Sequence, residues 1–98
     1  MNFITDEILT GVIADQPTNE FGSHDIFSTL MARFPREYVS DLCEALNSDQ
    51  DPFVKLHTDI AKHLTSAHFS DVVRPTGVKR RSRNCRGQYD MCEVWHRV

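Results

Sequence analysis

Apolar residues in the first two thirds of the chain recur at the spacing of α-helices that bury one face. This spacing predicts four helices, over residues 5–15, 24–34, 36–46 and 52–65. The polar segment 16–22 is expected to be a loop. The apolar positions assigned to the inner faces are Ile8, Leu9, Val12, Ile13, Ile26, Phe27, Leu30, Met31, Phe34, Val39, Leu42, Cys43, Leu46, Phe53, Leu56, Ile60 and Leu64. The pattern therefore favours a small helical bundle.

Residues that favour helix ends support these boundaries. Thr5 and Ser23 carry side-chain oxygens that can accept a hydrogen bond from the first turn of the first and second helices. Pro35 ends the second helix and fits the first turn of the third. Asp51 followed by Pro52 is the combination that opens a helix, so the fourth helix has the clearest start.

The spacing changes to that of β-strands after the fourth helix. Residues 78–84 and 90–97 are predicted to pair as two strands, and Gly87 between them supplies the positive φ that a hairpin turn usually needs. On the second strand Cys92, Val94 and Val98 alternate with Glu93, Trp95 and Arg97. This alternation indicates one buried and one more exposed face. Trp95 is nevertheless interpreted as a packing residue, because large aromatic side chains usually join a core.

The order of these elements predicts a single α+β domain over residues 1–98, with three to four helices followed by a C-terminal β-hairpin. Its parts are an accessory helix at 5–15, a helical core at 24–66 and a hairpin at 70–98. A chain of 98 residues is long enough for one domain only. Hydrophobic residues make up 40% and charged residues 26%, which is ordinary for a globular protein.

Composition also limits the compartment. No apolar run approaches the roughly 18–20 residues that span a bilayer, and residues 1–7 lack the features of a signal peptide. The chain has three cysteines, Cys43, Cys85 and Cys92, and no CxxC motif. Because this number is odd, a disulfide framework is not expected. We therefore expect a cytoplasmic protein with reduced thiols and no membrane partner.

The net charge of −3 conceals a strong asymmetry. Residues 1–73 contain four Lys or Arg against twelve Asp or Glu, whereas residues 74–98 contain seven against two. Five of those cations lie between positions 79 and 86 with no acidic residue among them. This segregation favours a localised anionic partner. The alternative is that the basic strand is neutralised by the acidic helices of its own fold.

Compact helices followed by a basic hairpin resemble the winged-helix DNA-binding domains in element order and charge, over residues 24–98. The resemblance implies that helix 52–65 is the recognition helix and that residues 79–89 form the wing. It implies a small protein that binds duplex DNA, such as a transcriptional regulator. The DNA-binding residues would be Lys55, Thr58, Lys62 and His63 on the helix, and Lys79, Arg80, Arg81, Arg83, Asn84, Arg86 and Gln88 on the hairpin.

The fourth helix departs from this pattern because it is not basic. Lys55 and Lys62 flank Asp59, and Asp49 and Asp51 precede the helix. Carboxylates there repel phosphate, so the hairpin is the stronger candidate for anion binding. The alternative function is a protein-interaction module, such as a small phage-type inhibitor or an adaptor, which binds a partner protein through its charge-segregated surfaces.

The first helix leaves the oligomeric state open between monomer and homodimer. Its stripe Ile4, Ile8 and Val12 can pack on the core or form a dimer, and we favour the core.

Catalytic, cofactor and metal sites have little support in the sequence. There is no glycine-rich phosphate loop and no local signature of a nucleophile, so we expect neither an enzyme nor a cofactor. Cys85, Cys92 and His96 suggest zinc, but their spacing matches no common structural site, and no metal is expected. His57 is expected to pack beside the core as a neutral imidazole and His63 to be solvated. Tyr89 near the hairpin tip can serve packing or base stacking equally well.

Overall fold

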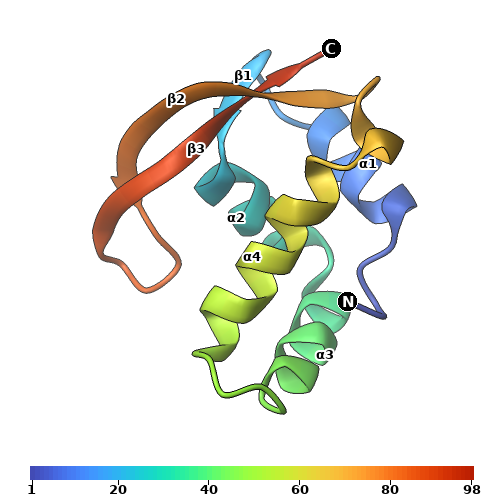
Figure 1. Ribbon diagram of the computed structural model, residues 1–98, viewed down its shortest axis with the longest axis vertical. Helices are drawn as coiled ribbons and strands as arrows, with labels where there is room; N and C mark the ends of the chain where they lie inside the picture. The colour runs from blue at the N-terminus through green and yellow to red at the C-terminus, as the bar shows by residue number, and fades with distance from the viewer.

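The computed structural model describes residues 1–98 as four α-helices and a three-stranded antiparallel sheet (Figure 1). The elements in chain order are α1 (Asp6–Ala14), β1 (Glu20–Gly22), α2 (Ser23–Arg33), α3 (Pro35–Ala45), α4 (Pro52–Leu64), the short 3₁₀ helix η1 (Ala67–Phe69), β2 (Val73–Arg83) and β3 (Tyr89–Arg97). The predicted α+β class is confirmed, with a helical bundle first and a hairpin last. None of the helices is long and apolar enough to cross a membrane.

The helix starts follow the capping residues in all but one case. The Asp51 carboxylate accepts hydrogen bonds from the backbone N–H groups of Phe53 and Val54, and proline occupies the first turn of α4. Gly22, and not Ser23, occupies the N-cap position of α2. The Ser23 hydroxyl instead accepts a hydrogen bond from Nε1–H of Trp95 at 2.8 Å. The predicted cap at Ser23 is wrong because a buried indole N–H needs that acceptor.

The segment expected to be a loop contains a strand. Glu20–Gly22 pairs antiparallel with β3, with Phe21 opposite Trp95, and the sheet order is β1-β3-β2. β3 is therefore the central strand and is covered more completely than an edge strand. Val94 and Trp95 are both buried although they are neighbours, and Val98 is exposed beyond the end of β3. The predicted alternation along this strand is wrong at these positions.

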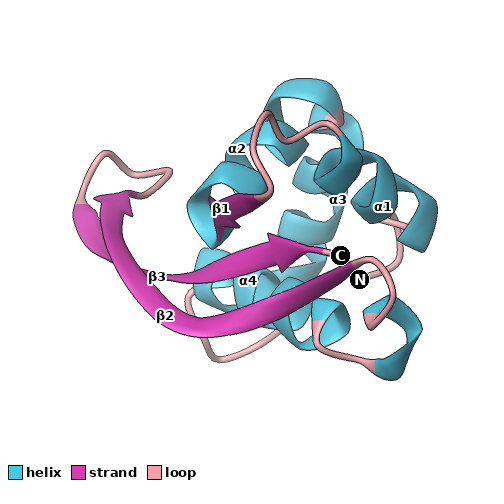
Figure 2. Ribbon diagram, turned by 90° about the horizontal axis from the view of Figure 1, so that it is seen from above, coloured by secondary structure: helices cyan, strands magenta, loops and turns pink.

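The first strand of the hairpin is longer than predicted, and the hairpin is curved (Figure 2). β2 begins at Val73, and its pairing with β3 shifts between Pro75 and Lys79, next to Gly77 at a φ of +79°. Such an irregularity increases the bend of a strand. The turn contains Gly87 at a φ of +79°, as predicted. Figure 2 shows the hairpin arching beyond the helices, with its tip turned back beside the helical body.

One hydrophobic core joins the helices to the sheet. It contains 15 buried residues, among them Leu9 and Val12 of α1, Leu30 of α2, Ile60 of α4 and Trp95 of β3. Ile4 belongs to the same core. The apolar stripe of the first helix therefore packs on the core, as we favoured, although Ile8 at its edge is only half-buried.

The inner face predicted for α3 is wrong at Val39, Cys43 and Leu46, whereas Leu42 is partly buried and packs against the core. Val39 is 53% and Leu46 66% exposed, and Cys43 is also exposed. The helix is rotated so that its buried residues are Tyr38, Asp41 and Ala45. The outward residues Val39, Cys43 and Leu46 are called the α3 strip below.

Asp41 explains this rotation of α3. Its carboxylate is 2% exposed and accepts hydrogen bonds from the backbone N–H groups of Asn2 (2.7 Å), Phe3 (3.1 Å) and Ile4 (2.7 Å). A carboxylate with three such donors is well satisfied inside a protein. A buried polar anchor of this kind breaks the apolar periodicity on which a sequence prediction depends.

Candidate nucleic-acid interface

The five clustered cations of the hairpin divide between two faces of β2. Lys79, Arg81 and Arg83 alternate along the strand, so they share one face, and all three are exposed. Their direct partners across the ladder are Glu93, Met91 and Tyr89. None of the three forms an ion pair with a carboxylate. These three residues are called the cation row below.

The other two cations are paired with the helical body. Arg80 forms an ion pair with Asp25 of α2 at 2.5 Å. Arg86 donates to both carboxylate oxygens of Asp51 at 2.5 Å, and its guanidinium lies over the ring of Phe53, 4.7 Å from the ring centroid. The hydrogen bond from Arg86 holds the pKa of Asp51 below its usual value. Internal neutralisation therefore applies to Arg80 and Arg86 but leaves the cation row free.

The turn residues predicted to contact DNA have different roles. Asn84 accepts hydrogen bonds from the backbone N–H groups of Arg86 and Gln88 and donates to Asp90, so its side chain builds the turn. The side-chain amide of Gln88 has no partner within the protein and lies at the same turn. Arg83 Nε also donates to the carbonyl oxygen of Gly87 at 3.1 Å, which orients its guanidinium at the tip.

The predicted contacts on α4 separate into an exposed group and an engaged one. Lys55, Thr58 and Lys62 follow the spacing of one helical face, and Thr58 and Lys62 are exposed. Lys55 is half-buried and forms an ion pair with Asp59 at 3.0 Å. The exposed face of α4 therefore offers one unpaired cation, Lys62.

His63 lies on another side of α4 and faces α1. Its Nε2 is hydrogen-bonded to Asp6, whose other carboxylate oxygen is 2.8 Å from Nε2 of His68. The hydrogen bond from His63 lowers the pKa of Asp6. The expectation that His63 is free and solvated is wrong, because its ring joins the start of α1 to the end of α4.

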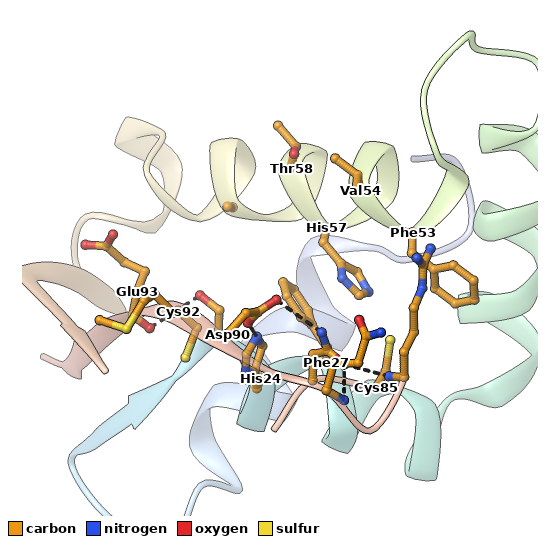
Figure 3. Close-up of a pocket in the computed structure, with 16 residues that line it drawn as sticks. His24, Phe27, Phe53, Val54, His57, Thr58, Cys85, Asp90, Cys92 and Glu93 are labelled. Carbon is orange, nitrogen blue, oxygen red and sulfur yellow. Dashed lines mark hydrogen bonds and ion pairs between the residues drawn. The ribbon is translucent and has the colours of Figure 1, made fainter. Parts of the chain in front are cut away.

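A groove of 510 Å³ runs between α4 and the hairpin (Figure 3). Val54 and Thr58 line it from α4, and Met91 and Glu93 line it from β3. Asp90 and Cys92 also line the groove, so side chains from both faces of β3 reach it, and two of them, Met91 and Glu93, are the ladder partners of Arg81 and Lys79. No local sequence pattern indicates this groove, because its walls come from segments that are distant along the chain.

His57 closes the groove on the side of the core. Its ring stacks on Phe27 with 3.9 Å between the ring centroids, and Nε2 is hydrogen-bonded to the Tyr38 hydroxyl at 2.7 Å. Burial lowers the pKa of His57 to about 4 and raises the pKa of Tyr38. The imidazole is therefore neutral at neutral pH, as predicted. Its second nitrogen, Nδ1, has no partner within the protein.

His24 connects α2 to the two strands of the hairpin. Its Nε2 is 2.9 Å from Asp90, its Nδ1 is hydrogen-bonded to the Ser82 hydroxyl, and that hydroxyl is 3.3 Å from Sγ of Cys92. This chain of hydrogen bonds holds the hairpin against α2, and three of its residues, His24, Asp90 and Cys92, also line the groove. The zinc candidates Cys85, Cys92 and His96 do not come together with other ligands, and no metal-binding group is formed.

Comparison of the chain with protein families, with curated proteins and with solved structures finds no match. A function for the protein therefore has to be inferred from the residues of this chain.

Proposed function

We propose that the protein binds DNA through the cation row of its hairpin, in the manner of the wing of a winged-helix domain. The observation that carries this proposal is that Lys79, Arg81 and Arg83 are exposed on one face and that none of them forms an ion pair with a carboxylate. Unpaired cations in a row are suited to successive phosphates of a nucleic-acid backbone. Small size combined with DNA binding is typical of transcriptional regulators, so this is the functional class we propose.

The helix α4 supplies the second part of the proposed contact. Thr58 and Lys62 are exposed on the face that would enter the major groove. Asp59 pairs with Lys55, which removes part of the repulsion expected between this helix and phosphate. His63, Asn84 and Arg86 are engaged within the protein, so the proposal gives them no direct contact with DNA.

Fluorescence anisotropy with a random duplex tests this proposal. The substitutions Lys79→Ala, Arg81→Ala and Arg83→Ala together remove the cation row. The matched control carries Arg33→Ala, Arg36→Ala and Arg74→Ala, which remove the same charge from other exposed positions. At about 50 mM salt we expect the first variant to lose at least about tenfold in affinity and the control to change by less than about threefold. No binding by the native chain, or equal losses in both variants, would contradict the proposal.

A protein-interaction module is the second candidate, and the α3 strip favours it. Val39 and Leu46 expose apolar surface on a helix whose opposite side packs in the core. Exposed apolar residues gathered on one face are typical of protein interfaces. This candidate predicts a protein partner that is captured by the native chain and by the variant lacking the cation row, and lost when Val39→Asp and Leu46→Asp are introduced. Capture that depends only on the cation row would refute it.

A further inference from the structure

We infer that the groove between α4 and the hairpin accepts an unpaired nucleobase of the DNA strand whose phosphates lie on the cation row. This inference rests on the proposed function and makes it more specific. It assigns the protein a preference for DNA that carries single-stranded bases over fully paired duplex.

Charge segregation across the hairpin supports this arrangement. Glu93 and Asp90 line the groove, and the Arg86 guanidinium that also lines it is paired with Asp51, so a phosphate is repelled from the groove. Lys79 and Arg81 lie directly across the ladder from Glu93 and Met91. Neighbouring strands are separated by only about 4.8 Å, so a phosphate on β2 and its attached base beside β3 can belong to one nucleotide.

The uncharged groups of the groove suit a flat ring with a hydrogen-bonding edge. Val54 and Met91, which are 55% and 58% exposed, present apolar walls on opposite sides. Nδ1 of His57, the hydroxyl of Thr58 and the amide of Gln88 line the same groove and have no partner within the protein. Figure 3 shows His57 extending from α4 toward the hairpin segment that carries Cys85 and Asp90. Apolar walls combined with a few unpaired polar groups are the usual composition of a ligand site.

The size and the carboxylates of the groove define the kind of base. Its volume of 510 Å³ lies within the range of small-molecule pockets, roughly 300–1,000 Å³. A base stacked inside a duplex cannot enter such a site without leaving the helix. The Glu93 carboxylate has no partner within the protein and is a hydrogen-bond acceptor, which matches the exocyclic amino groups of cytosine and adenine. Thymine has no such group, so it should bind more weakly.

The test compares three labelled probes by fluorescence anisotropy at about 50 mM salt. One is a fully paired duplex, the second adds a short 3′ overhang of dC, and the third adds an overhang of dT of equal length. Val54→Trp fills the groove from an exposed position. Val39→Trp is the matched control, because Val39 on α3 is 53% exposed and Val54 is 55% exposed. Circular dichroism and the thermal midpoint establish that both variants fold.

We expect the dC overhang to strengthen binding by about tenfold over the paired duplex and the dT overhang to add clearly less. Val54→Trp should remove the gain from the dC overhang and leave duplex affinity within about twofold, whereas Val39→Trp should change neither. Equal affinity for all three probes, or a gain that survives Val54→Trp, would overturn the inference and leave the proposed function standing. Absence of binding to every probe would refute both.

Discussion

The burial of His57 predicts a specific loss of stability in mild acid. The folded protein holds the pKa of His57 at about 4, whereas the unfolded chain titrates near the ordinary value of 6.5. Between these two values the unfolded state binds more protons than the folded state, so acidification favours unfolding. The stability that depends on neutral His57 is therefore complete above pH 6.5 and is lost as the pH falls toward 4.

The magnitude follows from the two pKa values. One pKa unit corresponds to about 1.4 kcal/mol, so lowering the pH from about 7 to about 4.5 should cost roughly 2 kcal/mol of unfolding free energy through this residue. The half-buried ring keeps part of its hydration, so this loss is smaller than the full difference between the two pKa values would give. Such a loss is a large fraction of the stability of a small domain.

Urea unfolding followed by tryptophan fluorescence measures this effect, because Trp95 is the single tryptophan and is 1% exposed. The control is His57→Gln, whose amide oxygen can still accept a hydrogen bond from Tyr38 but does not titrate. The native chain should lose about 2 kcal/mol more than this variant between the two pH values. An equal pH dependence in both proteins, or an NMR titration of His57 near 6.5, would refute the reasoning.

Three further predictions concern contacts that hold α3 and the hairpin turn in place. Asp41→Ala removes the acceptor of three backbone N–H groups and should lower the free energy of unfolding in urea by about 2–3 kcal/mol. The control Glu44→Ala removes only the exposed contact with Asn2 and should lower it by less than about 1 kcal/mol. Similar losses in both variants would be inconsistent with a buried anchor at Asp41. Gly87→Ala should destabilise the protein by about 1 kcal/mol, measured as a lower thermal midpoint, because a side chain is strained at a φ of +79°, and an unchanged midpoint would argue against that turn. Arg86→Ala should accelerate amide hydrogen exchange in the hairpin turn, because the ion pair between Arg86 and Asp51 attaches the tip to α4. An unchanged exchange rate would show that other contacts hold the tip.

The elements of the fold that periodicity and capping specify were predictable from the sequence. α4 follows its apolar spacing and its Asp51–Pro52 start, and Gly87 marks the turn of the hairpin. Local signals of this kind depend on residues a few positions apart. Helices and turns that are marked by such local signals therefore lie close to the residue ranges predicted for them.

The parts of the fold that depend on long-range partners were not predictable in this way. β1 has only three residues, so it carries no recognisable strand pattern, and it exists because β3 offers it an edge. The rotation of α3 depends on Asp41, whose donors are 37 to 39 residues away in the chain. A polar residue on a helix is ordinarily assigned to solvent, so its burial reverses the predicted face.

The candidate site was predictable in its charge and not in its geometry. The run of cations in the sequence identified the hairpin, but only the structure shows that Arg80 and Arg86 are paired with Asp25 and Asp51. Side chains alternate between the two faces of a β-strand, so the predicted strand 78–84 already implies that Lys79, Arg81 and Arg83 share one face. The groove required the relative position of α4 and β3, which no local pattern contains.

Salt-dependent binding to a duplex tests the central claim most directly. Each phosphate contact contributes about −0.9 to the slope of log affinity against log salt, so the cation row should contribute a slope of roughly −3, or about 40-fold between about 50 and 200 mM salt. The account predicts that the native chain shows at least this salt dependence and that replacing Lys79, Arg81 and Arg83 by alanine reduces the slope by roughly 3. An unchanged slope in that variant, or no binding by the native chain at the lower salt concentration, would contradict it.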